Sequence, residues 1–187
     1  MNNLSEMKLH NGLDVAIRPI RPSDAYELFS LHKRSSTETL YNRYLRTYTP
    51  SYNSLQALCQ IEKANGFALV AVAHLPWETV IGTAHYFVEQ GQGHGPRTAE
   101  PAFHIEDRFQ GMGLGKALYN ALTQHAIANG IKRFTAYVHP GNKAMEKVFV
   151  RGSHPVTSQL AYGTREIEVD LSLRRVQLEK RPLPLAF

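Results

Sequence analysis

The stretch from Ile105 to Leu118, IEDRFQGMGLGKAL, contains three glycines at alternate positions, and a long helical pattern of apolar residues begins directly after them. Glycine inside a helix costs about 1 kcal/mol relative to alanine, so three glycines this close indicate a loop that requires an unobstructed backbone. Backbone N–H groups at the start of a helix bind anions, because they have no partner in the helix and lie at the positive end of its dipole. The stretch therefore predicts a β-loop-α unit with a phosphate-binding loop; a glycine-rich turn without a ligand is the alternative.

Two well-known phosphate-binding motifs do not fit this loop. A Walker A loop has four residues between its glycines and a serine or threonine after the lysine, whereas Gly111 and Gly115 enclose three residues and Ala117 follows Lys116. The dinucleotide fingerprint reads G-x-G-x-x-G after an early strand, whereas this stretch reads G-x-G-x-G late in the chain. The interpretation that remains is a cradle of main-chain N–H groups that binds a pyrophosphate. Gly111, Gly113 and Gly115 have no side chains, so a ligand can approach this backbone closely.

Length and composition favour one globular domain, residues 1–187, that ends in a basic tail over residues 173–187. The chain is 43% hydrophobic and 20% charged, and its longest apolar run, FALVAVA, is too short to cross a bilayer. The N-terminus has no signal pattern, and Cys59, the one cysteine, is expected to pack in the core, so a cytoplasmic setting without a membrane partner is expected. The net charge of +5 would favour an anionic ligand, but the basic tail has no interleaved aromatic residues, and no nucleic-acid partner is expected.

Hydrophobic periodicity and turn residues divide the chain into strands and helices. Strands are expected at residues 14–21, 67–75, 79–90, 97–105 and 132–140, with a terminal hairpin over residues 156–173 that turns near Gly163. Helices are expected at residues 22–34, 37–46, 54–66, 115–130 and 142–151, and residues 91–97 are expected to connect two strands. This order predicts an α/β or α+β fold in which a sheet with antiparallel edges contains one helical crossover.

The spacing Gln110-x-x-Gly113-x-Gly115, with Phe103-His104-Ile105 before it and a long helix after it, resembles the acetyl-CoA signature of the GNAT N-acetyltransferases. The NKAMEK motif after the next strand resembles that family's following motif, and the order of elements is similar over nearly the whole chain. SSTETLYNRYL and AEPAFHIEDRFQGMGLGKAL are similar to the acetyltransferase domain of bacterial Pat-type protein-lysine acetyltransferases. The resemblance implies a GNAT-like fold, with a mixed, mostly antiparallel central sheet, flanking helices and a β-loop-α acetyl-CoA site.

The resemblance also implies a set of coenzyme-binding residues. In the family, the strand before the glycine loop diverges from its neighbour and its free backbone groups pair with the pantetheine arm, at positions that Phe103 and Ile105 occupy here. Main-chain N–H groups of the loop would hold the pyrophosphate, and they belong to Gln110, Gly111, Met112, Gly113, Leu114, Gly115 and Lys116. Asn142 would contact the coenzyme arm, and a role as N-cap of the next helix fits it equally well. The implied co-substrate is acetyl-CoA.

Attack of an amine on a thioester requires a neutral amine, and a lysine amine has a pKa of about 10.4, so the site needs a base. Glu100 lies ten residues before Gln110, the spacing at which Pat-type domains carry a glutamate base; a solvated carboxylate at a strand end is the alternative. His104 is expected on the same side of its strand as Glu100, which makes it a second candidate base or an orienting partner. The other histidines show no metal-ligand spacing, so no metal is expected.

The reaction that the resemblance implies is direct transfer of an acetyl group from acetyl-CoA to a primary amine, with a protein lysine as the leading acceptor and a small amine or polyamine as the near alternative. A regulatory module that binds the coenzyme without turnover is the rival interpretation, because it needs the glycines but not Glu100. Many relatives protonate the departing thiolate with a tyrosine seven residues after the asparagine, where this chain has Phe149. Arg43, Tyr44, Arg46 and the terminal hairpin are expected at the acceptor side, and the assembly is open between a monomer and a homodimer.

Overall fold

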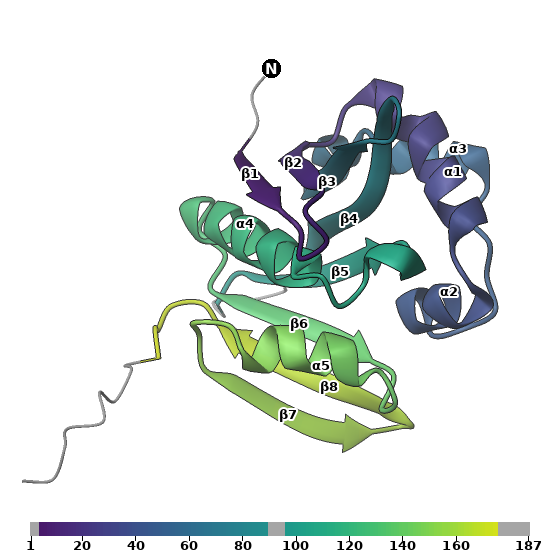
Figure 1. Ribbon diagram of the computed structural model, residues 1–187. Helices are drawn as coiled ribbons and strands as arrows, with labels where there is room; N and C mark the ends of the chain where they lie inside the picture. The colour runs from purple at the N-terminus through teal and green to yellow at the C-terminus, as the bar shows by residue number, and fades with distance from the viewer. Residues whose placement is uncertain (1–3, 90–95, 176–187) are drawn as a thin grey trace, which may run out of the picture.

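The computed structural model describes residues 4–89 and 96–175, which form one eight-stranded sheet with helices on both faces (Figure 1). The strands are β1 (Ser5–Lys8), β2 (Asp14–Pro19), β3 (Gly66–His74), β4 (Glu78–Val88), β5 (Thr98–Ile105), β6 (Arg133–Val138), β7 (Val156–Ala161) and β8 (Thr164–Asp170). The helices are α1 (Ala25–Arg34), α2 (Thr37–Tyr44), α3 (Tyr52–Leu58), α4 (Leu114–Ala128) and α5 (Lys143–Val150), with short 3-10 turns at Pro22–Asp24, Ile61–Ala64 and Asp107–Phe109.

The strand order is β1-β2-β3-β4-β5-β6-β8-β7, and β5 with β6 is the one parallel pair among the described strands. A parallel pair requires a crossover, and α4 supplies it between β5 and β6. The mixed, mostly antiparallel sheet that the sequence predicts is therefore confirmed. The terminal hairpin is confirmed as well, since β7 and β8 turn at Tyr162 and Gly163, which both have positive φ.

Two elements differ from the expected pattern. The sequence pattern does not predict β1, because three of its four residues, SEMK, are polar. A turn with Gly12 at φ +86° brings this strand antiparallel to β2. The single helix expected over residues 54–66 is divided into α3 and the 3-10 turn that begins at Ile61. Leu55 and Ile61 are both buried, and residues six apart are turned by about 240° around an α-helix, so one straight helix could not bury both against the same sheet face. The connection expected at residues 91–97 lies mostly outside the described residues, as does the tail after Arg175.

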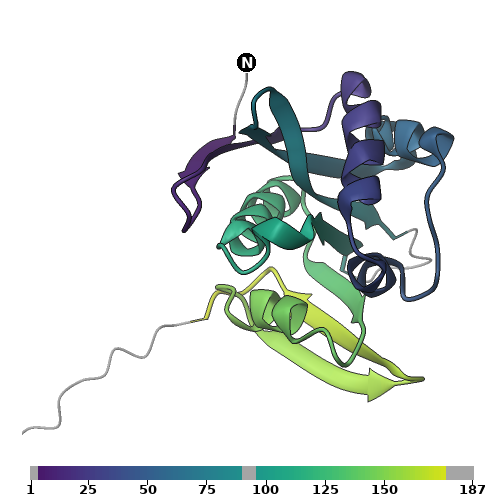
Figure 2. The same ribbon diagram turned by 45° about the vertical axis from the view of Figure 1, so that its right-hand side comes forward.

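Two apolar clusters hold α1, α3, α4 and α5 on opposite faces of the sheet (Figure 2). The larger cluster joins α4 and α5 to one face, and the smaller one joins α1 and α3 to the other face through Val70 and Val72 of β3. Because β3 is covered on both sides, its sequence is a continuous apolar run rather than an alternating one. Cys59 lies in the smaller cluster, where burial raises the pKa of its thiol to about 11, so the prediction that Cys59 packs in the core is confirmed.

The sheet opens between β5 and β6. These two strands pair at two positions, Thr98 with Arg133 and Ala99 with Phe134, and have no further register pairs in the described structure. On its other side, β5 stays paired with β4 up to Ile105. Pro101 lies just past the point of divergence and has no N–H group to donate to a neighbouring strand. The backbone edge of β5 that faces β6 is therefore open from Glu100 onward.

Candidate active site

A cavity of about 920 Å³ lies where β5 and β6 separate, with α2 on one side and the glycine loop and α5 on the other. Ten of the twelve residues that the sequence predicts for catalysis or coenzyme binding line it, namely Glu100, Phe103, His104, Ile105, Gln110, Gly111, Gly113, Gly115, Lys116 and Asn142. The side chains of Met112 and Leu114 pack into the core instead, so only their main-chain groups could face a ligand. Arg43, Tyr44 and Arg46 of the α2 region line the cavity as expected, whereas no described residue of β7 or β8 does.

The three glycines of the loop have different structural roles. Gly111 and Gly113 have φ values of +73° and +92°, a left-handed conformation that strains other residues. Gly113 is the N-cap of α4. Gly115 is helical, and a Cβ there would lie 3.3 Å from Cγ2 of Val148. The first two glycines therefore shape the loop, and the third allows α4 to pack closely against α5.

The first turn of α4 faces the cavity. In a helix of 15 residues, the N–H groups of the first turn have no carbonyl partner within the helix and lie at the positive end of its dipole. Lys116 lines the cavity from this turn. His10, in the turn between β1 and β2, also lines the cavity, and its Nε2 lies 3.7 Å from the position of a Cβ on Gly113. The sequence does not point to His10, because the strand that carries it toward the loop is not predicted.

Side-chain hydrogen bonds tie the glycine loop to α2. Nε2 of Gln110 donates to Oγ1 of Thr39 at 2.9 Å and to the carbonyl of Ile105 at 3.0 Å. Asp107 accepts from the backbone N–H of Ser36 at 2.8 Å, and from the hydroxyls of Ser36 and Thr39 at 2.5 and 2.8 Å. The start of α2 is thus fixed to the segment that begins the loop.

The middle of the cavity combines an open strand edge with a capped helix. Phe103 packs edge-on against Phe149, with ring centroids 6.0 Å apart, so its side chain is turned into the core. The backbone of β5 is then what borders the gap toward β6. On the far side, Oδ1 of Asn142 accepts from the N–H of Met145 at 3.0 Å, which confirms Asn142 as the N-cap of α5. Asn142 also lines the cavity, so an N-cap role and a ligand contact are compatible.

Glu100 is an exposed residue of β5 beside the point of divergence, paired in register with Phe87 of β4. Desolvation raises the pKa of its carboxyl group above the ordinary value, the positive charge of Arg43 lowers it, and the negative charge of Glu89 raises it further. A raised pKa makes a carboxylate a stronger base. Glu100 therefore combines access to the cavity with increased basicity.

His104 has a different environment from Glu100. The side chain is buried, its Nε2 lies 2.8 Å from Oγ of Ser35, and that hydroxyl donates to the carbonyl of Leu31. A hydroxyl has one proton, so the imidazole must donate through Nε2 and carry its lone pair on Nδ1, which is buried and has no partner among the described residues. Desolvation, together with His32 and Arg43, lowers the pKa of His104 well below the ordinary value. His104 is thus a neutral group that supports the wall of the cavity.

Arg43 is held at the α2 side of the cavity by a histidine. Its Nη2 donates to Nε2 of His85 at 3.1 Å, and its guanidinium lies 4.8 Å from the ring centroid of Tyr44. Because arginine can only donate, His85 must accept through an unprotonated Nε2. Desolvation and then Arg43 lower the pKa of His85 well below its ordinary value, which keeps the ring neutral. The sequence did not single out His85, because its partner lies 42 residues away.

Phe149 occupies the position at which the resemblance in sequence leads us to expect a tyrosine. It is 1% exposed and packs against Phe103 and Tyr119 with edge-on ring contacts. This position therefore contributes packing and no proton. Tyr137 of β6 lines the cavity, and its hydroxyl donates to Glu166 at 3.4 Å.

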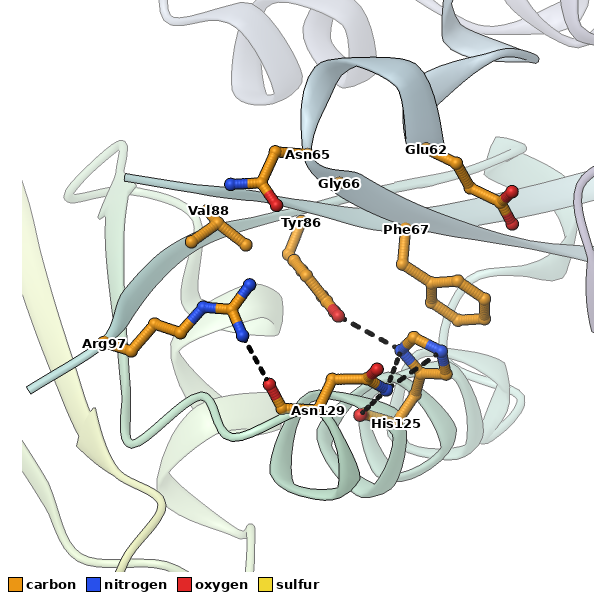
Figure 3. Close-up of a pocket in the computed structure, with 9 residues that line it drawn as sticks. All are labelled: Glu62, Asn65, Gly66, Phe67, Tyr86, Val88, Arg97, His125 and Asn129. Carbon is orange, nitrogen blue, oxygen red and sulfur yellow. Dashed lines mark hydrogen bonds between the residues drawn. The ribbon is translucent and has the colours of Figure 1, made fainter. Parts of the chain in front are cut away.

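A second, smaller cavity of about 240 Å³ lies near the C-terminal end of α4 (Figure 3). Four of its lining residues are hydrogen-bonded in pairs: Oη of Tyr86 lies 3.1 Å from Nδ1 of His125, and Arg97 donates to the carbonyl of Asn129 at 2.7 Å. The ring of His125 is stacked on Phe67. These contacts join α4 to the ends of β3 and β4, which is a structural role.

Residues 4–89 and 96–175 contain neither a cluster of metal ligands nor a membrane-spanning helix. No group of three or more His, Cys, Asp or Glu residues within those ranges could hold a metal ion. Among the helices that the same ranges contain, none has the length and apolar character needed to cross a bilayer.

The fold and the cavity define the class of protein. A helix capped by a left-handed glycine faces a gap between two parallel strands, and the family model described as "Acetyltransferase (GNAT) family" matches residues 37–152 of this chain. The chain belongs to this family.

Within the family, the chain is similar to Pat-type proteins. It is 32% identical over 154 residues to "Acetyltransferase Pat" of Mycolicibacterium smegmatis, an alignment that covers 82% of this chain and 45% of that protein. The chain thus spans less than half the length of that curated relative. The solved structure of the GNAT domain of S. lividans PAT superposes with a TM-score of 0.77 at 27% identity, covering 89% of this chain and 96% of that one.

The fold is also similar to that of a structure that contains acetyl-CoA. The structure of yncA, a putative acetyltransferase from Salmonella typhimurium with its cofactor acetyl-CoA, superposes with a TM-score of 0.69 at 18% identity. The match covers 84% of this chain and 94% of that one. In that protein, a fold similar to this one binds acetyl-CoA.

Proposed function

We propose that this protein transfers the acetyl group of acetyl-CoA directly to a primary amine, with the side chain of a protein lysine as the leading acceptor. The observation that carries the proposal is the arrangement of three features along one cavity. The glycine-capped start of α4 lies at one end, the open edge of β5 lies in the middle, and the basic carboxylate of Glu100 lies toward the other end. The relatives named acetyltransferases support it.

The cavity fits a long coenzyme with phosphates at one end. The N–H groups of the α4 first turn, with Lys116, would hold the pyrophosphate, because they form a positive cradle shaped by Gly111 and Gly113. The free backbone groups of β5 at Phe103 and Ile105 would pair with the pantetheine arm, and Asn142 would contact that arm from the other side. Acetyl-CoA, when bound, supplies a thioester carbonyl that an amine can attack.

The acid–base chemistry of the site is assigned to one carboxylate. Glu100 would remove a proton from the incoming ammonium group, so that the amine attacks in its neutral form. Arg43 would keep Glu100 ionised before the acceptor arrives, since its charge opposes the rise in the carboxyl pKa. His104 would position α1 against β5 through Ser35 rather than exchange protons with a substrate, because its Nε2 is engaged with Ser35 and its Nδ1 is buried. The departing thiolate would take its proton from solvent or from the newly formed ammonium, since Phe149 has none.

A coenzyme-binding module without turnover remains the second candidate, because the glycines alone would satisfy it. The raised pKa of Glu100 beside the open end of the gap favours an enzyme. The single domain, the cytoplasmic setting and the choice between a monomer and a homodimer stay predictions from the sequence.

Replacement of Glu100 by glutamine tests the proposed function. The amide keeps the size of the side chain but cannot accept the proton, so turnover at neutral pH should fall by roughly 10²- to 10⁴-fold. Affinity for CoA should hardly change, because the pyrophosphate cradle consists of main-chain groups. Raising the pH should restore part of the rate, as solvent then supplies the neutral amine. Turnover is followed by release of free thiol with a panel of lysine proteins and amines, and CoA affinity by calorimetry.

A matched control is Glu62→Gln, which removes a carboxylate from the second cavity and should leave turnover unchanged. Turnover of Glu100→Gln equal to that of the wild type at every pH would remove Glu100 from the mechanism. Thiol release without any acceptor would indicate hydrolysis, and CoA binding without thiol release would support the non-catalytic module.

A further inference from the structure

The charges that line the large cavity are unbalanced. Glu100 is the one carboxylate among its described lining residues, and the basic residues are Arg43, Arg46, Lys116, Lys147 and Arg151. Lys116 belongs to the first turn of α4, and Lys147 precedes Val148, which contacts Gly115. These lysines therefore lie beside the glycine loop, where the phosphates of a coenzyme would neutralise them. Arg43 and Arg46 lie on the α2 side, where no coenzyme phosphate is expected.

The two arginines of the α2 region contact a histidine and aromatic rings rather than carboxylates. Arg43 donates to the neutral ring of His85, and the guanidinium of Arg46 lies 4.7 Å from the ring centroid of Tyr48. Neither arginine takes part in an ion pair among the described residues. Tyr44 and Tyr48 contact each other edge-on, so the two stacked arginines form one local arrangement.

This arrangement suits an anion better than a cation. A guanidinium group has five N–H donors in a planar fork that matches a carboxylate, and Arg43 uses one of them for His85 in the described structure. An acceptor amine enters as an ammonium ion, which the two arginines repel and the single carboxylate of Glu100 attracts. A negatively charged group on the acceptor, close to its ammonium group, would offset this repulsion.

We propose that the acceptor of this acetyltransferase carries an anionic group close to the reactive amine, and that Arg43, with Arg46 beside it, selects for that group. The substrate class is then a lysine with acidic neighbours in the sequence or on the protein surface, or a small amine that also bears a carboxylate. Polyamines are disfavoured, since each additional ammonium group adds repulsion. This inference rests on the proposed function, because it concerns the acceptor side of the same cavity.

The test compares three peptides of equal length that share one central lysine and differ only in its neighbours, which are glutamates, glutamines or arginines. The measured quantity is kcat/KM for thiol release from acetyl-CoA at low salt. The wild type should prefer the acidic peptide over the basic one by about tenfold or more in kcat/KM. This ratio corresponds to the summed interaction free energies of a few solvent-screened charge pairs. The preference should shrink at high salt, since screening weakens these pairs. A glutamate-like small amine and a polyamine extend the comparison to small acceptors.

Variants then assign the preference to a residue. Arg43→Gln should reduce the ratio between acidic and basic peptides to within about threefold of unity, and Arg43→Lys should keep part of it, because the charge remains without the fork. A change in the environment of Glu100 would lower the rate with all peptides alike, so the ratio separates acceptor selection from an effect on the base. Arg46→Gln provides a second variant. Arg133→Gln is the matched control, since that arginine lies on β6 outside the cavity and should leave the ratio unchanged.

The outcomes are distinct. Equal kcat/KM for all three peptides, a preference for the basic peptide, or fastest turnover of the polyamine would overturn the inference while leaving the proposed function intact. An acidic preference that Arg43→Gln and Arg46→Gln both leave unchanged would also overturn it. Absence of turnover with every acceptor, despite CoA binding, would overturn the proposed function and this inference together.

Discussion

Gly113 shapes the fold, and we propose that it also allows the coenzyme to bind. Its φ of +92° is a conformation that a side chain strains, and as N-cap it places the first N–H groups of α4 toward the cavity. Gly113→Val should therefore abolish CoA binding or weaken it strongly, and should also lower stability by about 1–2 kcal/mol. Calorimetric titration with CoA and thermal unfolding measure the two effects.

Gly163 offers a matched control for this substitution. It has φ +78° in the turn between β7 and β8, and a Cβ there would meet nothing within 4 Å. Gly163→Val should thus carry a similar cost in stability without any loss of CoA affinity. A folded Gly113→Val variant that binds CoA as tightly as the wild type would show that the phosphate cradle lies elsewhere.

The element that most depends on polar contacts is α2. None of its residues is buried, so its position is held by side-chain bonds such as those from Asp107 to Ser36 and Thr39. Asp107→Ala removes these bonds and should loosen the helix that carries Arg43. We expect kcat/KM for the acceptor to fall by about tenfold, as for a misplaced binding group, with a small change in Tm.

Hydrogen exchange over residues 37–44 should become faster in the same variant, since local stability there depends on the lost bonds. Asp170→Ala is the matched control, because Asp170 accepts from the N–H and hydroxyl of Ser172 in the same manner but lies in the terminal hairpin. Unchanged exchange and unchanged kcat/KM in Asp107→Ala would mean that packing alone positions α2.

At the scale of the whole molecule, three histidines from α1, β4 and β5 meet beneath α2. Burial is the first cause that lowers the pKa of His32, His85 and His104 in the folded protein. In the unfolded chain, histidine titrates near a pKa of about 6.5. Below that pH, the unfolded chain binds protons that the folded protein excludes, so stability should be full above about pH 6.5 and should decline as the pH falls toward 5.

Tm measured from pH 8 to pH 5 checks this expectation. His104→Gln should reduce the slope, because one of the three groups no longer titrates, while the substitution of the exposed His74 by glutamine should leave it unchanged. A Tm that stays constant down to pH 5 would mean that the folded protein accommodates protonated histidines.

Local sequence was sufficient for most elements and for the glycine loop before α4. The glycine spacing and the apolar period after it predict α4 and its loop, because both depend on residues within one or two helical turns. Local sequence does not predict β1. Its four residues have no strand pattern of their own, and they pair only because β2 is present. Local sequence also fails to predict the break before Ile61, where burial of this side chain interrupts the helical pattern.

The sequence by itself determined the order of most elements, the class of fold and the position of the glycine loop, and it offered Asn142 as a helix cap. Only the tertiary structure decided how the acceptor side is built. Arg43 meets His85 across 42 residues, Ser35 meets His104 across 69, and Thr39 meets Gln110 across 71. Such contacts depend on the order of the strands in the sheet and on the point at which β5 diverges from β6. The hydrophobic periodicity of a single segment contains no information about strand order or about this divergence. For that reason a residue such as His85, which has no motif around it, becomes part of the site only in the folded chain.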